Sequence, residues 1–202
     1  MREARIIVVL LVALAVSGCG GGSGAPRGEA ASAGAGPVSS VPATAATPAE
    51  YAPAGGFNTT DVAWLQLMRP MTEQNLRLLE LVSDRTADPR LTRLAREAVR
   101  DGDAHLARLR TLLDRARAGG ANPHEGHDMP GLPTTEELAG IAGTRGAEFD
   151  RRFTATFREY AEQCARLAGS ERTAGADAET TALAEAIERS ATGQLAALRQ
   201  LA

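Results

Sequence analysis

The chain has 202 residues, of which 44% are hydrophobic and only 3% aromatic, and its formal net charge is −3. This slightly acidic balance argues against a nucleic-acid-binding protein, because such proteins present a basic face to phosphates. The two cysteines, Cys19 and Cys164, are too few for a small scaffold held together by disulfides.

The first 18 residues have the features of a bacterial export signal. Two arginines precede the apolar run IIVVLLVALAV, which is too short to span a bilayer. The run leads into Ser17-Gly18-Cys19, which resembles the lipobox that precedes a diacylated cysteine in bacterial lipoproteins. An ordinary secretory signal with a chance cysteine is the alternative. We predict that residues 1–18 are removed and that Cys19 carries a lipid, which anchors the mature chain at the extracytoplasmic face of the cell membrane.

Residues 19–56 are predicted to form a tether. After Cys19 this segment consists almost entirely of Gly, Ala, Ser, Pro and Thr, with three charged side chains. Such a composition cannot bury enough apolar area to offset the entropy of ordering the chain. We therefore expect a disordered N-terminal segment between the anchor and one folded domain at residues 57–202.

The folded domain is predicted to be all-α, because apolar residues recur at helical spacing and no strand pattern competes. Residues with N-cap chemistry precede several of these segments. The first expected helix runs from the cap at residues 57–61 to about Val82, and the second from Asp88-Pro89 to about Ala118. A short helix is expected to start at the capping-box sequence Thr134 to Glu137. Two long helices follow, from about Ala147 to Ala168 and from about Ala178 to Leu201.

The two halves of this domain are related by a constant offset of 89 positions. The matched residues are Asp61 with Asp150, Trp64 with Phe153, Met68 with Phe157, Glu73-Gln74 with Glu162-Gln163, Leu94-Ala95 with Leu183-Ala184, and Leu109 with Leu198. We interpret this as a duplicated helical hairpin, with repeats at about residues 57–118 and 146–202. Because neither hairpin can bury its apolar stripe alone, the two are expected to pack face to face as a four-helix bundle.

Two stretches also resemble a known family. "FNTTDVAWLQLMRPMTEQ" and "HDMPGLPTTEELAGIAGTRGAEFDRRF" are similar to segments of the exported bacterial DUF 305 proteins. The resemblance covers residues 57–202. It implies a ferritin-like, up-down four-helix bundle built from two hairpins.

The resemblance also implies a metal centre, for which this chain lacks the side chains. In the family a Met-x-Pro phrase is followed by a His-His pair, a second pair occupies the equivalent turn of the third helix, and copper is a plausible ligand. Here Met71-Thr72 and Tyr160-Ala161 stand at those positions. A thioether and a phenol are a poor ligand set for such metals, so no cofactor is expected at the bundle centre.

A different metal site is suggested by the loop sequence "ANPHEGHDMPGLP". His124, His127 and Met129 lie close together there, and a thioether with two imidazoles suits Cu(I). Met68 and Met71 could add thioethers, although methionine at helical spacing usually fills a core. A plain solvated linker is the favoured interpretation of this loop, because two imidazoles and a mobile thioether form no preorganised ligand shell.

Other polar residues are interpreted as structural. His105 and its repeat partner Gln194 predict a buried hydrogen-bonding layer rather than a metal site. Glu73 and Glu162 lack the Glu-x-x-His pairs of a di-iron centre. Cys164 is expected to behave as a small buried hydrophobe.

No arrangement of nucleophile and base, and no phosphate-binding loop before a helix, indicates catalysis. The sequence therefore predicts a non-enzymatic, lipid-anchored cell-envelope protein, structural or protein-binding, whose partner it does not name. The alternative is a weak extracytoplasmic copper-binding protein that uses His124, His127 and Met129.

Overall fold

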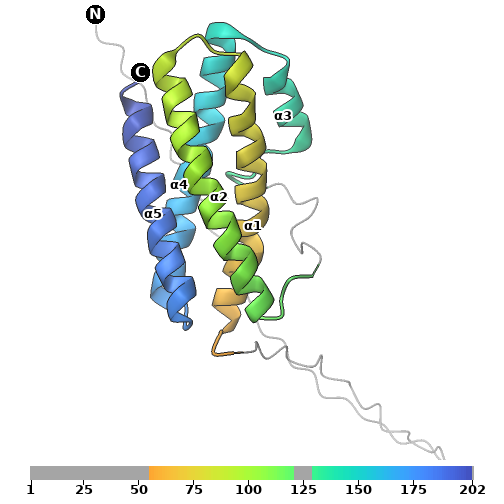
Figure 1. The fold of residues 1–202 in the computed structure, drawn as a ribbon, viewed down its shortest axis with the longest axis vertical. Helices are drawn as coiled ribbons and strands as arrows, with labels where there is room; N and C mark the ends of the chain where they lie inside the picture. Colours follow the sequence, from red (N-terminus) through yellow and green to blue (C-terminus); the bar gives the residue numbers. More distant parts are fainter. Residues whose placement is uncertain (1–54, 121–128, 202) are drawn as a thin grey trace, which may run out of the picture. The chain divides into compact units, whose positions relative to one another are not determined.

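Four long helices make up most of residues 55–120 and 129–201, the parts that the computed structural model describes (Figure 1). The elements are α1 (Thr59–Glu80), the 3-10 helix η1 (Leu81–Asp84), α2 (Pro89–Arg115), α3 (Thr135–Ala142), α4 (Gly146–Ala174) and α5 (Ala178–Arg199). These described ranges contain no strand, only one isolated bridge between Met129 and Leu132. The predicted all-α fold is confirmed. Cys19, the tether, His124 and His127 lie outside the described residues.

Local sequence signals account for where most helices begin. Asn58 caps α1 and exchanges hydrogen bonds with Asp61, and Thr134 does the same with Glu137 at the start of α3. Asp88 caps α2, where proline occupies the first turn. Each cap satisfies backbone N–H groups that the first helical turn leaves without partners. Inside α1, Pro70 is buried and the helix continues through it.

Two helix ends differ from the predicted ones. α2 ends at Arg115, before the expected end near Ala118. α4 extends to Ala174, beyond the expected end near Ala168. Gly169 and Ser170 are poor helix formers and weaken the local signal, whereas the last turn meets the start of α1, where Asn58 donates to the Ala174 carbonyl.

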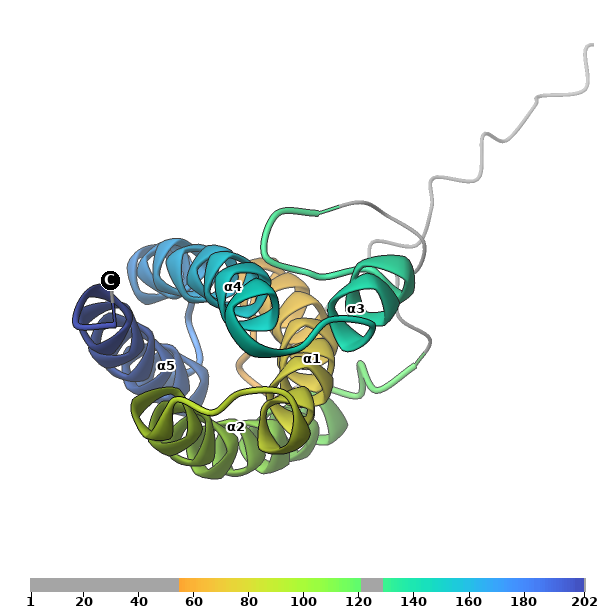
Figure 2. The same ribbon diagram turned by 90° about the horizontal axis from the view of Figure 1, so that it is seen from above.

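The four long helices form a square in which every neighbour is antiparallel (Figure 2). The start of α1 meets the end of α4, where Asn58 Nδ2 donates to the Ala174 carbonyl over 2.8 Å. The end of α2 meets the start of α5, where Arg115 pairs with Asp177. In Figure 1, α1 runs up, α2 and α4 run down, and α5 runs up. The connection from α2 to α4 therefore crosses the full length of the bundle, as in ferritin-like folds. α3 lies outside the square, beside α1 and α4 (Figure 2).

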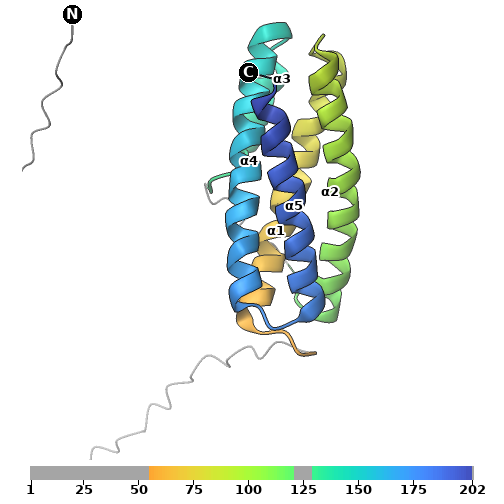
Figure 3. The same cartoon turned by 90° about the vertical axis from the view of Figure 1, so that its left-hand side faces the viewer.

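Repeat-related residues occupy equivalent buried positions, as the 89-residue offset predicts. Trp64 and Phe153 are both buried, as are Met68 and Phe157. Along α4 the aromatic rings stack in a row, with centroids 5.6 Å apart for Phe149 and Phe153 and 5.5 Å apart for Phe153 and Phe157. The hairpins α1–α2 and α4–α5 therefore supply matching halves of one core, and α5 lies beside the longer α4 (Figure 3).

Candidate functional site

The positions that the family resemblance assigns to histidine pairs lie in the middle of the bundle. Met71 and Thr72 on α1, and Tyr160 and Ala161 on α4, are all buried. The Thr72 hydroxyl donates to the Met68 carbonyl one turn earlier, over 2.8 Å. These turns are therefore filled by packed side chains, and the one aliphatic hydroxyl among them is already used by its own helix.

The Tyr160 hydroxyl is the polar group at the centre of this region. It lies against the side chains of Thr72, Asn75 and Cys164. Burial, with Cys164 beside it, raises the pKa of Tyr160 well above its ordinary value, and burial raises the pKa of the Cys164 thiol to about 12. Both groups are consequently neutral at physiological pH and offer no anionic ligand.

A small polar cavity adjoins Tyr160. It brings together the two residues of the predicted hydrogen-bonding layer, but neither side chain is fully buried or hydrogen-bonded to another described residue. His105 and Gln194 both line it, and both are half-buried. Burial lowers the pKa of His105, and Arg108 adds to this effect while Asp101 opposes it, so the imidazole is neutral at pH 7. The cavity has a volume of about 10 Å³ and is lined by Asn75, Ala98, Gly102, His105, Tyr160, Cys164, Ile187, Ser190, Ala191 and Gln194.

Most of these lining residues are repeat partners. Four pairs stand 89 positions apart: Asn75 with Cys164, Ala98 with Ile187, Gly102 with Ala191, and His105 with Gln194. Equivalent residues of a duplicated structure meet only near the axis that relates its halves. The cavity therefore lies at that internal axis. We call this set of polar residues (Asn75, His105, Tyr160, Cys164, Ser190 and Gln194) the central layer. Asn75 and Cys164 are separated by the same offset, so this signal could have identified them as further members of the layer.

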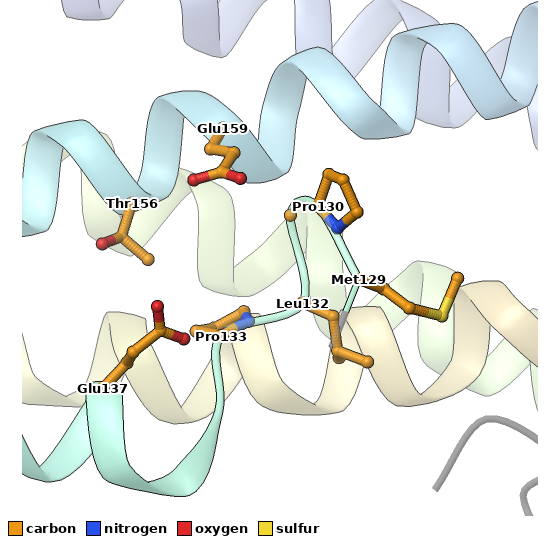
Figure 4. A pocket seen from close by; sticks show the side chains of 8 residues that line it. Met129, Pro130, Leu132, Pro133, Glu137, Thr156 and Glu159 are labelled. Atoms are coloured by element: carbon orange, nitrogen blue, oxygen red, sulfur yellow. The ribbon is translucent and has the colours of Figure 1, made fainter. Parts of the chain in front are cut away.

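Residues 129–133, which follow the two loop histidines in the sequence, line an open pocket between α3 and α4 (Figure 4). Met129 is partly exposed at its edge, and the carboxylates of Glu137 and Glu159 point into it from the two helices. The pocket has a volume of about 230 Å³. One Glu137 oxygen accepts from the Thr134 backbone N–H over 2.7 Å. A side chain at Gly131 would come within 2.7 Å of the Gln163 Cβ, so the close approach of this turn to α4 requires glycine.

Other predicted candidates do not converge. Glu73 pairs with Arg110 on the surface over 3.0 Å, and Glu162 is exposed. Met68 is completely buried. Within residues 55–120 and 129–201 no three His, Cys, Asp or Glu side chains are placed to hold a metal ion. In the same ranges no helix is long and apolar enough to cross a membrane.

One buried polar cluster was not predicted. At the end of the bundle where α1 begins, the carboxyls of Asp61 and Glu171 lie together, and neither residue has any exposed surface. Asp61 accepts hydrogen bonds from the backbone N–H groups of Asn58, Ala176 and Asp177, over 2.6 to 3.3 Å. We call Asp61, Glu171 and Asp177 the end cluster. No sequence signal pointed to it, because Asp61 precedes the other two members by more than 100 residues.

The two carboxyls of the end cluster differ in acidity. Burial raises the pKa of Glu171 to about 8, and the neighbouring Asp61 adds to this effect. Burial acts in the same direction on Asp61, but the backbone N–H donors outweigh it, so the pKa of Asp61 is lowered. Neither Glu171 oxygen accepts a hydrogen bond from another described residue. The pair is therefore best described as a protonated Glu171 beside an ionised Asp61.

A larger groove lies between α2 and the end of α1. Its volume is about 590 Å³. Apolar side chains line its floor, and Arg96 and Arg100 stand beside them without an ion pair to any described residue. The lining residues are Leu79, Glu80, Val82, Ser83, Thr92, Ala95, Arg96, Val99 and Arg100. Because α1 has 22 residues, this groove is about 33 Å from the point where the chain enters the bundle.

The fold, a duplicated four-helix bundle with one long crossover, defines a class shared with other proteins. The family model described as "Domain of unknown function (DUF305)" matches residues 61–202. The chain therefore belongs to the DUF305 family, as its sequence predicts. None of the curated proteins matches it.

Several solved structures share this fold at low sequence identity. A DUF305 protein from Streptomyces coelicolor is 18% identical, with a TM-score of 0.63 over 70% of this chain and 91% of its own. A DUF305 fragment from Deinococcus radiodurans is 16% identical, with a TM-score of 0.61 over 73% of this chain and 97% of its own. CopM in its Cu(I)-bound form is 20% identical, with a TM-score of 0.60 over 71% of this chain and 96% of its own.

Proposed function

We propose that this chain is a lipid-anchored protein of the bacterial cell envelope that binds a protein partner, performs no catalysis and holds no metal at its bundle centre. The anchor is inferred from Ser17-Gly18-Cys19 after a short apolar run. The two remaining parts of the proposal concern the bundle centre and the groove beside α2.

The bundle centre is the observation that carries the proposal. Copper and related ions need several imidazoles, thiolates or carboxylates that converge on one point. Met71 and Ala161 offer a thioether and a methyl group, Thr72 donates its hydroxyl to its own helix, and Tyr160 stays protonated. These residues do not fit the metal centre that the family resemblance implies, and they favour a role that rests on the outer surface.

The groove beside α2 supports the protein-binding role. Its floor includes Leu79, Val82 and Ala95, while Arg96 and Arg100 lack ionic partners among the described residues. An amphipathic helix lays its apolar face into such a groove, and acidic side chains along its edge would complement the two arginines. We therefore propose an acidic amphipathic helix of another envelope protein as the occupant.

Crosslinking in living cells tests this role. A photoreactive amino acid at Thr92, inside the groove, should give an adduct whose linked peptide is acidic and amphipathic, and Arg96→Glu/Arg100→Glu should abolish it. The same amino acid at the exposed Ala104 of α2 is the matched control. Adducts that are identical at both positions, or insensitive to charge reversal, would argue against the groove as the binding surface.

The anchor has its own test. Cys19→Ala should move the protein from the membrane fraction into the soluble fraction or the medium, because the predicted tether contains no other apolar anchor. Retention of the variant in membranes would mean that the signal stays uncleaved or that the bundle itself binds lipid.

The loop beside α3 favours a second candidate function, weak copper binding. Met129 is partly exposed at a pocket that also receives Glu137 and Glu159 (Figure 4), and CopM, a protein of the same fold, is known in copper-bound forms. Titration calorimetry of the Cys19→Ala protein with Cu(I) and Cu(II) separates the two functions. Micromolar binding that His124→Ala/His127→Ala removes would establish the second function and overturn the first.

A further inference from the structure

The cavity in the central layer has the size of one water molecule. Its volume of about 10 Å³ is close to the smallest space that holds a buried water. An apolar cavity of this size would stay empty, but a polar one is filled when it offers two to four hydrogen-bonding groups. The character of the lining therefore decides what the cavity contains.

The lining includes a buried acceptor that no described residue satisfies. Asn75 is 2% exposed, and its Oδ1 atom has no donor among the described residues. Its side chain lies against the Tyr160 hydroxyl and lowers the pKa of the phenol, as an amide N–H group does. Reversing the amide would exchange its two polar atoms and still leave one of them without a partner. An unpaired buried amide group costs about 1–3 kcal/mol, so a partner for it is strongly favoured.

Further polar groups reach the same cavity from the other helices. His105 on α2 and Ser190 and Gln194 on α5 line it, and all three are half-buried. None of the three side chains hydrogen-bonds to another described residue. Together with Asn75 on α1 and Tyr160 on α4, they give the cavity a polar group from each of the four long helices. A guest at this point would contact both repeats.

We propose that the central layer binds one water molecule, which donates to Asn75 Oδ1 and is held from the opposite hairpin by the side chain of Gln194 or Ser190. The neutral Cys164 thiol and the neutral His105 imidazole border this site without supplying a charge. Bound at the axis between the repeats, the water connects α1 to α5, which otherwise make few contacts across the bundle.

Nuclear magnetic resonance of the full-length protein tests the proposal in solution. The side-chain amide protons of Asn75 should show a cross-relaxation signal from a bound water. Asn75→Leu removes the acceptor and places methyl groups in the cavity, so the signal from the neighbouring Tyr160 ring to water should be lost. Gln74→Leu, the adjacent position on α1 outside the cavity, should leave this signal unchanged.

A second variant keeps the test independent of whether Asn75→Leu folds. Cys164→Ala enlarges the cavity but retains Asn75, so the water signal should persist or increase. Absence of any water signal in the parent, or its survival in Asn75→Leu, overturns the proposal. Titration with Ag(I), a thiophilic ion, tests whether the cavity binds a metal instead. Tight Ag(I) binding that Cys164→Ala removes would assign the site to a soft cation and overturn the assignment to water.

Discussion

The central layer and the end cluster both bury polar side chains, but only the end cluster buries a charge. In the middle of the bundle, Tyr160, Cys164 and His105 are all neutral at physiological pH. At the end, Asp61 is ionised although it has no exposed surface. The difference follows from helix geometry. Backbone N–H groups are free only at helix starts, and Asp61 collects three of them from the caps of α1 and α5.

This comparison indicates where the fold tolerates a charged or metal-binding group. Mid-helix positions have no spare backbone donors, so a charge there would need side-chain partners that this chain does not supply. The substitutions below alter either the bundle centre or the end of the bundle at Glu171.

The largest expected effect comes from supplying ligands to the bundle centre. Replacing Met71, Thr72, Tyr160 and Ala161 together with histidine should create a copper site with a Kd of about 1 μM or lower, measured by calorimetry. The reason is that these four positions already face the interior from α1 and α4. The double variant Met71→His/Thr72→His provides only half of the ligands and should bind much more weakly. If the quadruple variant folds and binds no better than the parent, the assignment of these turns to the family's histidine pairs is wrong.

The second effect is a pH dependence located in the end cluster. Unfolded Glu171 ionises near pH 4.5 and the folded side chain near pH 8, so the folded state holds the extra proton between these values. The stability contributed by Glu171 therefore decreases as the pH rises from 4.5 to 8. The effect of Asp61 on stability depends on pH in the opposite direction. Its pKa in the folded state is lowered from the ordinary value of 3.8, so the stability that it contributes is lost as the pH falls through the folded pKa.

Glu171→Gln tests this dependence, because the amide can donate to Asp61 without carrying a proton that titrates. Relative to the parent, the variant should gain on the order of a few kcal/mol by pH 8, measured by urea denaturation across the pH range. Arg115, Asp177 and Glu179 remain paired in both proteins. Glu73→Gln, which removes only a surface ion pair, should change stability by about 0–1 kcal/mol. Parallel pH profiles for the parent and Glu171→Gln would contradict the protonated pair.

A third prediction probes how tightly the end cluster is packed. A side chain at Gly175 would clash with the Glu171 Oε1 atom and come within 2.7 Å of the Glu171 carbonyl oxygen, so Gly175→Ala should destabilise the protein by about 1–3 kcal/mol. Gly193→Ala is the matched control, because nothing lies within 4 Å of its added methyl group. In the interior of α5 this change should stabilise by about 0.5–1 kcal/mol. Equal effects of the two substitutions in thermal melts would show that Gly175 is not constrained.

The smallest effect is expected from the central layer. Tyr160→Phe removes one hydroxyl from a neutral hydrogen-bonded group and should cost about 0.5–1.5 kcal/mol. Because the pKa of Tyr160 is raised well above its ordinary value and His105 is neutral from pH 7 upwards, the loss should be the same at pH 7 and pH 9. Denaturation at both pH values checks this, and a cost that changes between them would mean that a group of the layer titrates in this range.

Much of this architecture could be read from local patterns. The caps at Asn58, Asp88 and Thr134 depend on residues within a few positions of one another, and the structure places helix starts there. The 89-residue offset predicted that His105 and Gln194 share a polar layer, because equivalent positions of a duplication meet at its axis. The predicted end of α4 is too early, since Gly169 and Ser170 weaken the local signal, while the contact of the last turn with Asn58 joins residues 116 positions apart.

By itself, the sequence determined the helices, the duplication and the family, because periodicity, capping and repeat spacing are properties of neighbouring or regularly spaced residues. The tertiary structure alone decided that Asn75 faces Tyr160 and Cys164 across the axis, and that Glu171 lies against Asp61 at the end of the bundle. Both contacts join residues on different helices, and their protonation states depend on burial and on backbone donors that only the packed bundle brings together.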